Sequence, residues 1–110
     1  MWRIALDAMG GDGAPRVIIE GALSAVQEWP DRFAVSLVGI PESIRELLPP
    51  EIPDAIQIVP ATEVVEGHES PVRAIRRKPD SSIVVGLGLL RAGEVDAFIT
   101  LADFAPTFLE

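Results

Sequence analysis

Cysteine is absent from the 110-residue chain, and histidine occurs once, as His68. A chain without cysteine forms neither disulfides nor thiolate metal sites, and one histidine cannot build a multi-histidine metal site. His68 stands in a polar loop sequence without a nucleophile motif nearby, so we expect an exposed side chain rather than a catalytic one. Thiol chemistry and histidine-based metal chemistry within one chain are therefore excluded, and a reducing compartment is compatible with this composition.

Long apolar runs and positive charge are also scarce. The longest apolar run, Ile83–Leu90, contains two glycines and is far shorter than the about 20 residues that span a bilayer. The opening apolar run is interrupted by Asp7 and does not resemble a signal peptide. The formal net charge of −8 argues against general affinity for nucleic acid or anionic membrane. We therefore expect a cytoplasmic protein with no nucleic-acid partner.

What the sequence does contain is the composition of an ordinary globular domain. Apolar residues make up 48% and charged residues 24% of the chain, which is typical of a folded protein rather than a disordered one. Its length suits one domain with a single hydrophobic core.

Apolar runs alternate with helical periodicities along the chain. We predict strands at 2–6, 33–38, 55–59 and 97–100, and helices at 15–29, 41–48, 70–77 and 82–91. Short apolar strands that alternate with helices indicate an α/β fold with a mostly parallel sheet and helices on its faces. Because little sequence follows the last strand, the unit looks incomplete, and its open sheet edge would need a cover.

Two details of the predicted helices carry specific expectations. Gly21 lies inside the helix at 15–29, where glycine costs about 1 kcal/mol relative to alanine, so we expect it to pack closely against a neighbouring element. The run Asp80-Ser81-Ser82 is predicted to cap the helix at 82–91, which Gly93 would close.

The first candidate site is the loop after the first strand, which contains Asp7, Gly10, Gly11 and Asp12. Glycines let the backbone approach a ligand, and the helix start that follows offers N–H groups to an anion. Two carboxylates, however, repel phosphate unless a cation lies between them. In the competing structural interpretation, Asp7 accepts hydrogen bonds from loop amides and Asp12 helps to cap the helix.

The glycine loop does not fit the standard nucleotide-binding patterns. Arg16 stands where a dinucleotide fingerprint starting at Gly11 needs glycine, and a Walker A loop needs a Gly-Lys pair that the only lysine, Lys78, does not form. Nucleotide binding is therefore weakly supported.

The second candidate site is a basic cluster between Arg73 and Lys78, which holds four of the nine basic residues. On a helix, Arg73, Arg76 and Arg77 would share one face, and an anion or an acidic partner would stabilise that face. A solvated helix face is the competing interpretation. The capped helix start at Ser81 makes a further candidate anion site.

These two segments occur together in an order that resembles the bacterial phosphate acyltransferase family of phospholipid synthesis. The string Asp-Ala-Met-Gly-Gly-Asp is a specific motif of that family. The resemblance extends over approximately residues 1–99. The matching positions are 4–12, 14–15, 37–39, 58–59, 70–72, 76–78, 80–82, 93 and 96–98.

The resemblance implies a Rossmann-like, three-layer α/β/α fold. It implies an enzyme that moves a fatty acyl group from acyl carrier protein to inorganic phosphate, giving acyl phosphate. It further implies a cytoplasmic homodimer, peripheral at the membrane, that supplies a membrane glycerol-phosphate acyltransferase and uses no metal, nucleotide or other cofactor.

Residue roles follow from that resemblance, because phosphate must be held beside a thioester carbonyl. The candidates are Gly10 and Gly11 for close approach of the substrate; Arg77, Lys78 and Ser81 for phosphate; Asp7 and Asp12 as catalytic carboxylates that orient these groups; and Arg73 and Arg76 for docking the carrier protein.

The last ten residues depart from the family pattern, in which a Gly-Asn-Thr-Gly loop follows the fourth strand. We divide the chain into residues 1–100, the N-terminal part of an acyltransferase-like α/β domain, and residues 101–110, a divergent tail. Three functions remain open: an acyltransferase, a truncated and inactive fragment, or a module that binds an anion or acyl carrier protein. An uncovered apolar surface would favour aggregation or low stability.

Overall fold

Strand β1 (Trp2–Asp7) is an inner strand of the sheet and pairs on both sides with later strands. The computed structural model describes residues 1–64 and 76–102. Within these ranges all strand pairs are parallel and the order across the sheet is β3-β2-β1-β4. The other strands are β2 (Phe33–Gly39), β3 (Ile56–Pro60) and β4 (Ala97–Ile99).

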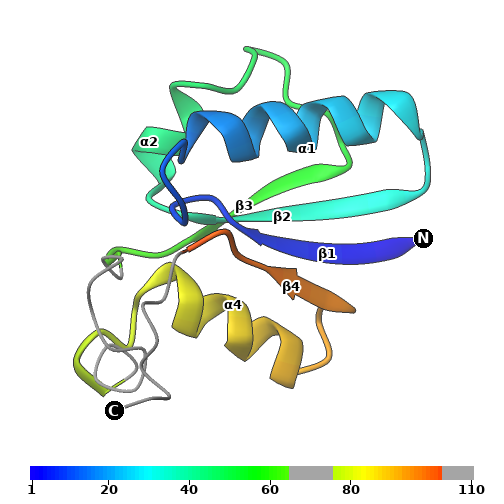
Figure 1. The fold of residues 1–110 in the computed structure, drawn as a ribbon. Coiled ribbons are helices and arrows are strands. Elements are labelled where there is room, and N and C mark those ends of the chain that lie inside the picture. The colour runs from blue at the N-terminus through cyan, green and yellow to red at the C-terminus, as the bar shows by residue number, and fades with distance from the viewer. Residues whose placement is uncertain (65–75, 103–110) are drawn as a thin grey trace.

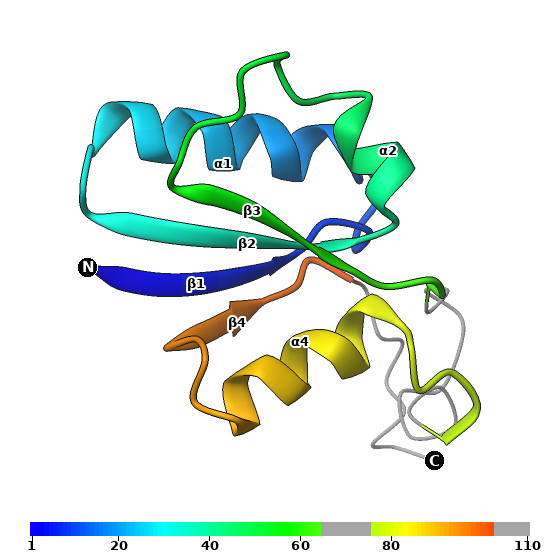
Figure 2. The ribbon, with the colours of Figure 1, turned by 180° about the vertical axis from the view of Figure 1, so that it is seen from behind.

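Helices cover both faces of this sheet (Figure 1). On one face lie α1 (Arg16–Glu28) and α2 (Pro41–Arg45), and on the opposite face lies α4 (Ser82–Arg91). Figure 2 shows the same three layers from behind. The predicted three-layer arrangement with a parallel sheet is confirmed, and each predicted strand lies within two residues of an observed one.

The core consists of two apolar layers, one on each face of the sheet. Ile19 of α1, Leu37 of β2 and Ile44 of α2 are fully buried in the first layer. The second layer joins Ala5 and Val38 to the half-buried Phe98 under α4. Alternation of side chains along each strand assigns neighbouring residues to opposite layers.

Three local predictions are wrong or need correction. Gly21 is exposed, and a Cβ added there would meet no atom within 4 Å, so it does not pack closely. The second helix ends at Arg45 rather than Leu48. Asp12 does not cap α1, because the N-cap is Pro15 and no side chain bonds to the cap.

Other predictions are confirmed at the helix on the opposite face. Ser81 is the N-cap of α4, and its side chain accepts a hydrogen bond from the Val84 amide. Gly93 follows the helix with φ of 75°, a left-handed conformation that glycine adopts without steric cost.

Parts of the predicted organisation lie outside the described residues. These are most of the helix at 70–77, the loop with His68, and residues 103–110 of the tail. In the part of the chain that is described, no helix is long and apolar enough to cross a bilayer.

Candidate functional site

The candidate site lies at the carboxyl edge of the sheet, where β1 and β4 end side by side. These strands pair with each other although most of the described chain separates them, and the helices that follow or precede them lie on opposite faces (Figure 1). In an open parallel sheet, such a reversal of strand order leaves a crevice in which ligands bind. The glycine loop after β1 and the segment after β4 meet at this point.

Asp7 ends β1 with a side chain that is 1% exposed. Its Oδ1 accepts a hydrogen bond from the Met9 amide at 3.0 Å, and its Oδ2 accepts one from the Thr100 hydroxyl at 2.8 Å. Thr100 Oγ1 in turn accepts from the Ala102 amide at 3.1 Å. The first half of the structural interpretation is confirmed, since Asp7 does bind a loop amide, and the same carboxyl also joins the ends of β1 and β4.

The two central glycines of the loop fit against the segment that leaves β4. A Cβ at Gly10 would lie 2.7 Å from both Asp7 Oδ2 and Thr100 Oγ1. Gly11 has φ of 97°, and a Cβ there would lie 3.1 Å from Leu101. Only glycine suits both positions, because the neighbouring backbone and side chains already occupy the space. In this structure the two glycines thus allow the segment after β4, residues 100–102, to pack closely against the loop.

Ser81 and Lys78 belong to a second group on the α4 side of the sheet. Lys78 Nζ donates to the carbonyl of Val64 at 2.8 Å. Ser81 is fully buried, its amide donates to the Lys78 carbonyl at 3.1 Å, and it forms a parallel bridge with Glu63. The segment before α4 is therefore held against the segment after β3.

Asp80 strengthens the same junction. Its carboxylate accepts hydrogen bonds from the Thr62 hydroxyl at 2.5 Å and from the Thr62 amide at 3.1 Å. Its carbonyl also accepts from the amides of Thr62 and Glu63.

The N-terminus of α4 has already used two of its first three amides. Ser82 N–H donates to the Glu63 carbonyl at 3.2 Å, and Val84 N–H donates to Ser81 Oγ at 3.3 Å. An anion at this helix start would therefore depend mainly on the remaining first-turn amide of Ile83 and on nearby cations.

Asp12 lies on the other side of the sheet, in the loop before α1 and near the C-terminal end of α2. It lines an open hollow of about 530 Å³ together with Arg16 and Glu46. Among the described residues, no hydrogen bond or ion pair joins Asp12 to Lys78 or Ser81. The structure thus brings Asp7, Gly10 and Gly11 together at one place, Lys78 and Ser81 at a second, and Asp12 at a third.

The arginines of the basic cluster are only partly described. Arg76 and Arg77 are exposed, and within residues 1–64 and 76–102 no acidic side chain pairs with either of them. Arg73 lies outside the described residues.

Thr100 and Leu101 are the site residues that sequence reasoning missed. Their sequence signal is weak, because a threonine and a leucine after a strand are ordinary. The informative fact is the strand order, which places the end of β4 beside the end of β1.

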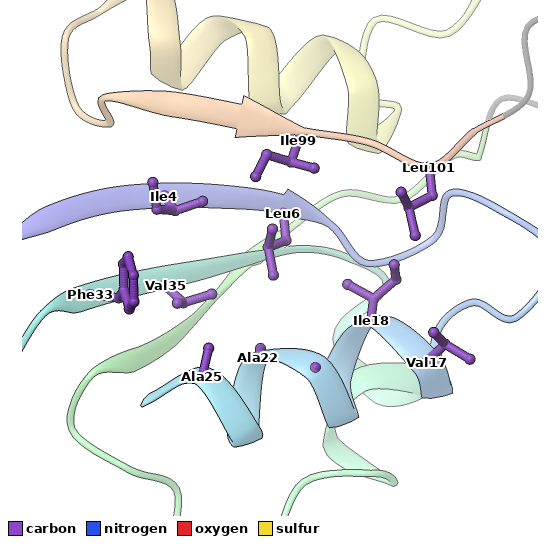
Figure 3. Close-up of a pocket in the computed structure, with 11 residues that line it drawn as sticks. Ile4, Leu6, Val17, Ile18, Ala22, Ala25, Phe33, Val35, Ile99 and Leu101 are labelled. Carbon is purple, nitrogen blue, oxygen red and sulfur yellow. The ribbon is translucent and has the colours of Figure 1, made fainter. Parts of the chain in front are cut away.

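An apolar hollow of about 400 Å³ opens beside this site, between α1 and β4 (Figure 3). Side chains of α1, β1, β2 and β4 point into it. Its lining is Ile4, Leu6, Val17, Ile18, Gly21, Ala22, Ala25, Phe33, Val35, Ile99 and Leu101.

A parallel sheet with reversed strand order and helices on both faces defines a doubly wound α/β protein, whose ligands bind at the carboxyl edge. The sequence matches the family described as "Fatty acid synthesis protein" over residues 2–105, and the chain belongs to that family.

Curated relatives carry the name phosphate acyltransferase. The protein of Desulfitobacterium hafniense strain Y51 is 52% identical over 101 residues, covering 91% of this chain and 30% of the relative. That of Brevibacillus brevis is 51% identical over 101 residues, covering 92% and 30%. That of Lactobacillus helveticus is 43% identical over 104 residues, covering 94% and 31%. The chain thus spans about 30% of the length of these relatives.

Proposed function

We propose that this chain supplies the glycine-loop part of a phosphate acyltransferase, which transfers a fatty acyl group from acyl carrier protein to inorganic phosphate. The observation that carries the proposal is its membership of the family, with relatives of that name up to 52% identical to it. In the reaction, a phosphate oxygen attacks the thioester carbonyl carbon, the C–S bond breaks, and the carrier thiolate leaves as acyl phosphate forms.

Under this proposal, Asp7 acts by positioning rather than by contact with phosphate. Both of its carboxyl oxygens accept hydrogen bonds from the protein, and the side chain is buried. The carboxyl holds Gly10 and Gly11 against the segment after β4, which shapes the floor of the crevice. Pre-organised backbone of this kind lowers the cost of holding two reactants together.

Phosphate would be held by Arg77 and Lys78 at the carboxyl edge. Arg77 is exposed, and the Lys78 ammonium group, which donates a hydrogen bond to the Val64 carbonyl, adds a second positive charge. Ser81, which is buried, would contribute as the N-cap that sets the direction of α4. Asp12 is exposed in the loop that precedes α1, and its proposed role is to orient the cations that bind phosphate.

The partners follow from the same chemistry. Arg73 and Arg76 would dock the acidic carrier protein, since clustered cations in a chain of net charge −8 offer one local site for a negative partner. The resemblance to the family also supports a homodimer in the cytoplasm, peripheral at the membrane, that passes acyl phosphate to a membrane glycerol-phosphate acyltransferase.

The test measures acyl phosphate formed by the purified chain from acyl carrier protein thioester and phosphate, in parallel with phosphate binding followed by NMR chemical shifts. Arg77→Ala should weaken phosphate binding several-fold. Arg91→Ala is the matched control, because Arg91 is also exposed but lies in the last turn of α4.

Turnover together with sensitivity to Arg77 supports the proposed function. Binding without turnover assigns the chain to the alternative class, a module that binds phosphate or the carrier protein. If a folded chain neither forms acyl phosphate nor binds phosphate, both functions are wrong for it.

A further inference from the structure

We propose that the outer face of α4 is a docking surface for the acidic acyl carrier protein. This outer face consists of Val84, Leu87 and Arg91, with Leu90 at its margin. The identity of the partner rests on the proposed function. The structure adds to it an apolar contact surface, which follows in the chain the arginines already proposed for docking.

The inner side of α4 is fully occupied by the sheet. Gly86 lies so close to the ring of Phe98 that a Cβ would overlap it. Val85 and Leu89 pack on the second layer of the core. Residues three and four apart share one side of a helix, so residues 84, 87 and 91 lie together on the side that faces away from the sheet (Figure 1).

That outer side lacks the polar residues that normally face solvent. The stretch from Ile83 to Leu90 contains no charged residue. Leu87 is 42% exposed and Leu90 is 39% exposed. A helix that is apolar on all sides is normally buried on all sides, and exposed apolar side chains that gather in one patch mark an interaction surface. The outer face of α4 is therefore suited to a partner that covers it.

The charges around α4 indicate the sign of that partner. Among α1, α2 and α4, only α4 has no acidic residue in its sequence. Arg91 lies in its last turn, and Arg76 and Arg77, both exposed, come shortly before its first. Of the nearby acids, Asp80 is already hydrogen-bonded to Thr62. An apolar face with cations toward both ends complements an acidic partner.

Other occupants use this combination less well. Free phosphate would bind the cations but gain nothing from Leu87. In a symmetric pair of chains joined through α4, the cations of one copy would meet those of the other across the two-fold axis, which disfavours this particular face as a contact between copies. An acidic protein uses the charges and the apolar side chains together.

The experiment titrates the isotope-labelled chain with a bacterial acyl carrier protein that holds no acyl group, so that docking is measured without the reaction. Amide chemical shifts report the contact. We expect saturable changes at residues 84–91 and at 76–77, and a dissociation constant that rises with salt concentration, because opposite charges attract less strongly when they are screened.

Two variants test the outer face. Leu87→Asp and Arg91→Glu should each raise the dissociation constant for the carrier protein by about fivefold to tenfold, and should leave phosphate binding unchanged. The matched controls lie outside α4. Ile52→Asp changes a residue that is 40% exposed between α2 and β3, and Arg45→Glu reverses an exposed charge in the last turn of α2. Circular dichroism verifies that each variant folds.

Several results would overturn the inference. One is a folded chain that does not bind the carrier protein. Another is binding that both α4 variants retain in full, or that the two controls weaken equally. Self-association of the chain that Leu87→Asp abolishes would assign the face to a second copy. Binding to phosphatidylglycerol vesicles through Leu87, without binding of the carrier protein, would assign it to a lipid surface.

The failure of this inference is distinguishable from the failure of the proposed function. If acyl phosphate forms and the KM for the carrier thioester is the same in Leu87→Asp and Arg91→Glu, the docking face is wrong and acyl transfer stands. If docking depends on both residues but no acyl phosphate forms, the docking face stands and acyl transfer by this chain is wrong.

Discussion

At the scale of single residues, the buried carboxyl of Asp7 joins two segments of the chain through hydrogen bonds. Asp7 has two hydrogen-bond partners, one in its own loop and one at Thr100, which is 93 positions away in the sequence. Buried polar groups are costly unless they are hydrogen-bonded. The Thr100 hydroxyl therefore supplies a hydrogen bond that the buried Asp7 carboxyl needs, and the same bond links the ends of β1 and β4.

Thr100→Val should destabilise the protein by about 1–3 kcal/mol, the usual cost of leaving a buried polar group without its partner. Valine keeps the branched shape of threonine, so packing changes little. The measurement is the free energy of unfolding in urea. Thr62→Val is the control, and it should cost less, because Thr62 and Asp80 are both exposed and water can replace the lost bond. Equal losses for the two variants would contradict this role of Asp7.

At the scale of elements, two glycines of α4 occupy opposite environments. Gly86 faces β4, and a Cβ there would overlap the ring of Phe98. Gly88 has nothing within 4 Å of the same position. The first glycine is required for the close approach of helix and strand, and the second only weakens the helix.

Gly86→Ala should therefore destabilise the protein by about 1–3 kcal/mol through overpacking. Gly88→Ala should stabilise it by up to about 1 kcal/mol through helix propensity. Both values come from urea unfolding followed by circular dichroism. A stabilising Gly86→Ala would show that α4 can move away from Phe98 without loss, and the proposed tight packing would be wrong.

At the scale of the whole molecule, an ion pair joins Arg3 of the first strand to Asp96, the residue just before the last strand. Arg3 Nη2 lies 3.0 Å from Asp96 Oδ1, and the Arg3 amide donates to Asp96 Oδ2 at 2.9 Å. The side-chain hydrogen bond from Arg3, followed by the backbone one, holds the pKa of Asp96 below its ordinary value of 3.8. The same side-chain bond raises the pKa of Arg3.

Because the pKa of Asp96 is depressed in the folded state, its stabilising contribution is complete above the unfolded pKa of about 4 and is lost as pH falls through the folded pKa. Asp96→Asn should therefore reduce the acid-dependent loss of stability below about pH 4. Unfolding free energies between neutral and acid pH measure this. Glu51→Gln, at an exposed carboxyl, is the control. An unchanged acid slope in the Asp96 variant would contradict the prediction.

Much of the fold could be predicted from local patterns. The strands at 2–6 and 33–38 and the helix at 82–91 agree closely with β1, β2 and α4, because side-chain periodicity and capping act over a few residues. The environment of Gly21 could not be predicted, since its exposure depends on whether another element covers that part of α1.

The sequence alone determined the parallel α/β class, the glycine loop after the first strand and the family, because these depend on local order along the chain. Only the tertiary structure decided that Asp7 pairs with Thr100, that Gly10 and Gly11 face the segment after β4, and that Asp12 lies apart from Ser81. These contacts follow from strand order, which places distant segments side by side through packing that no local pattern encodes.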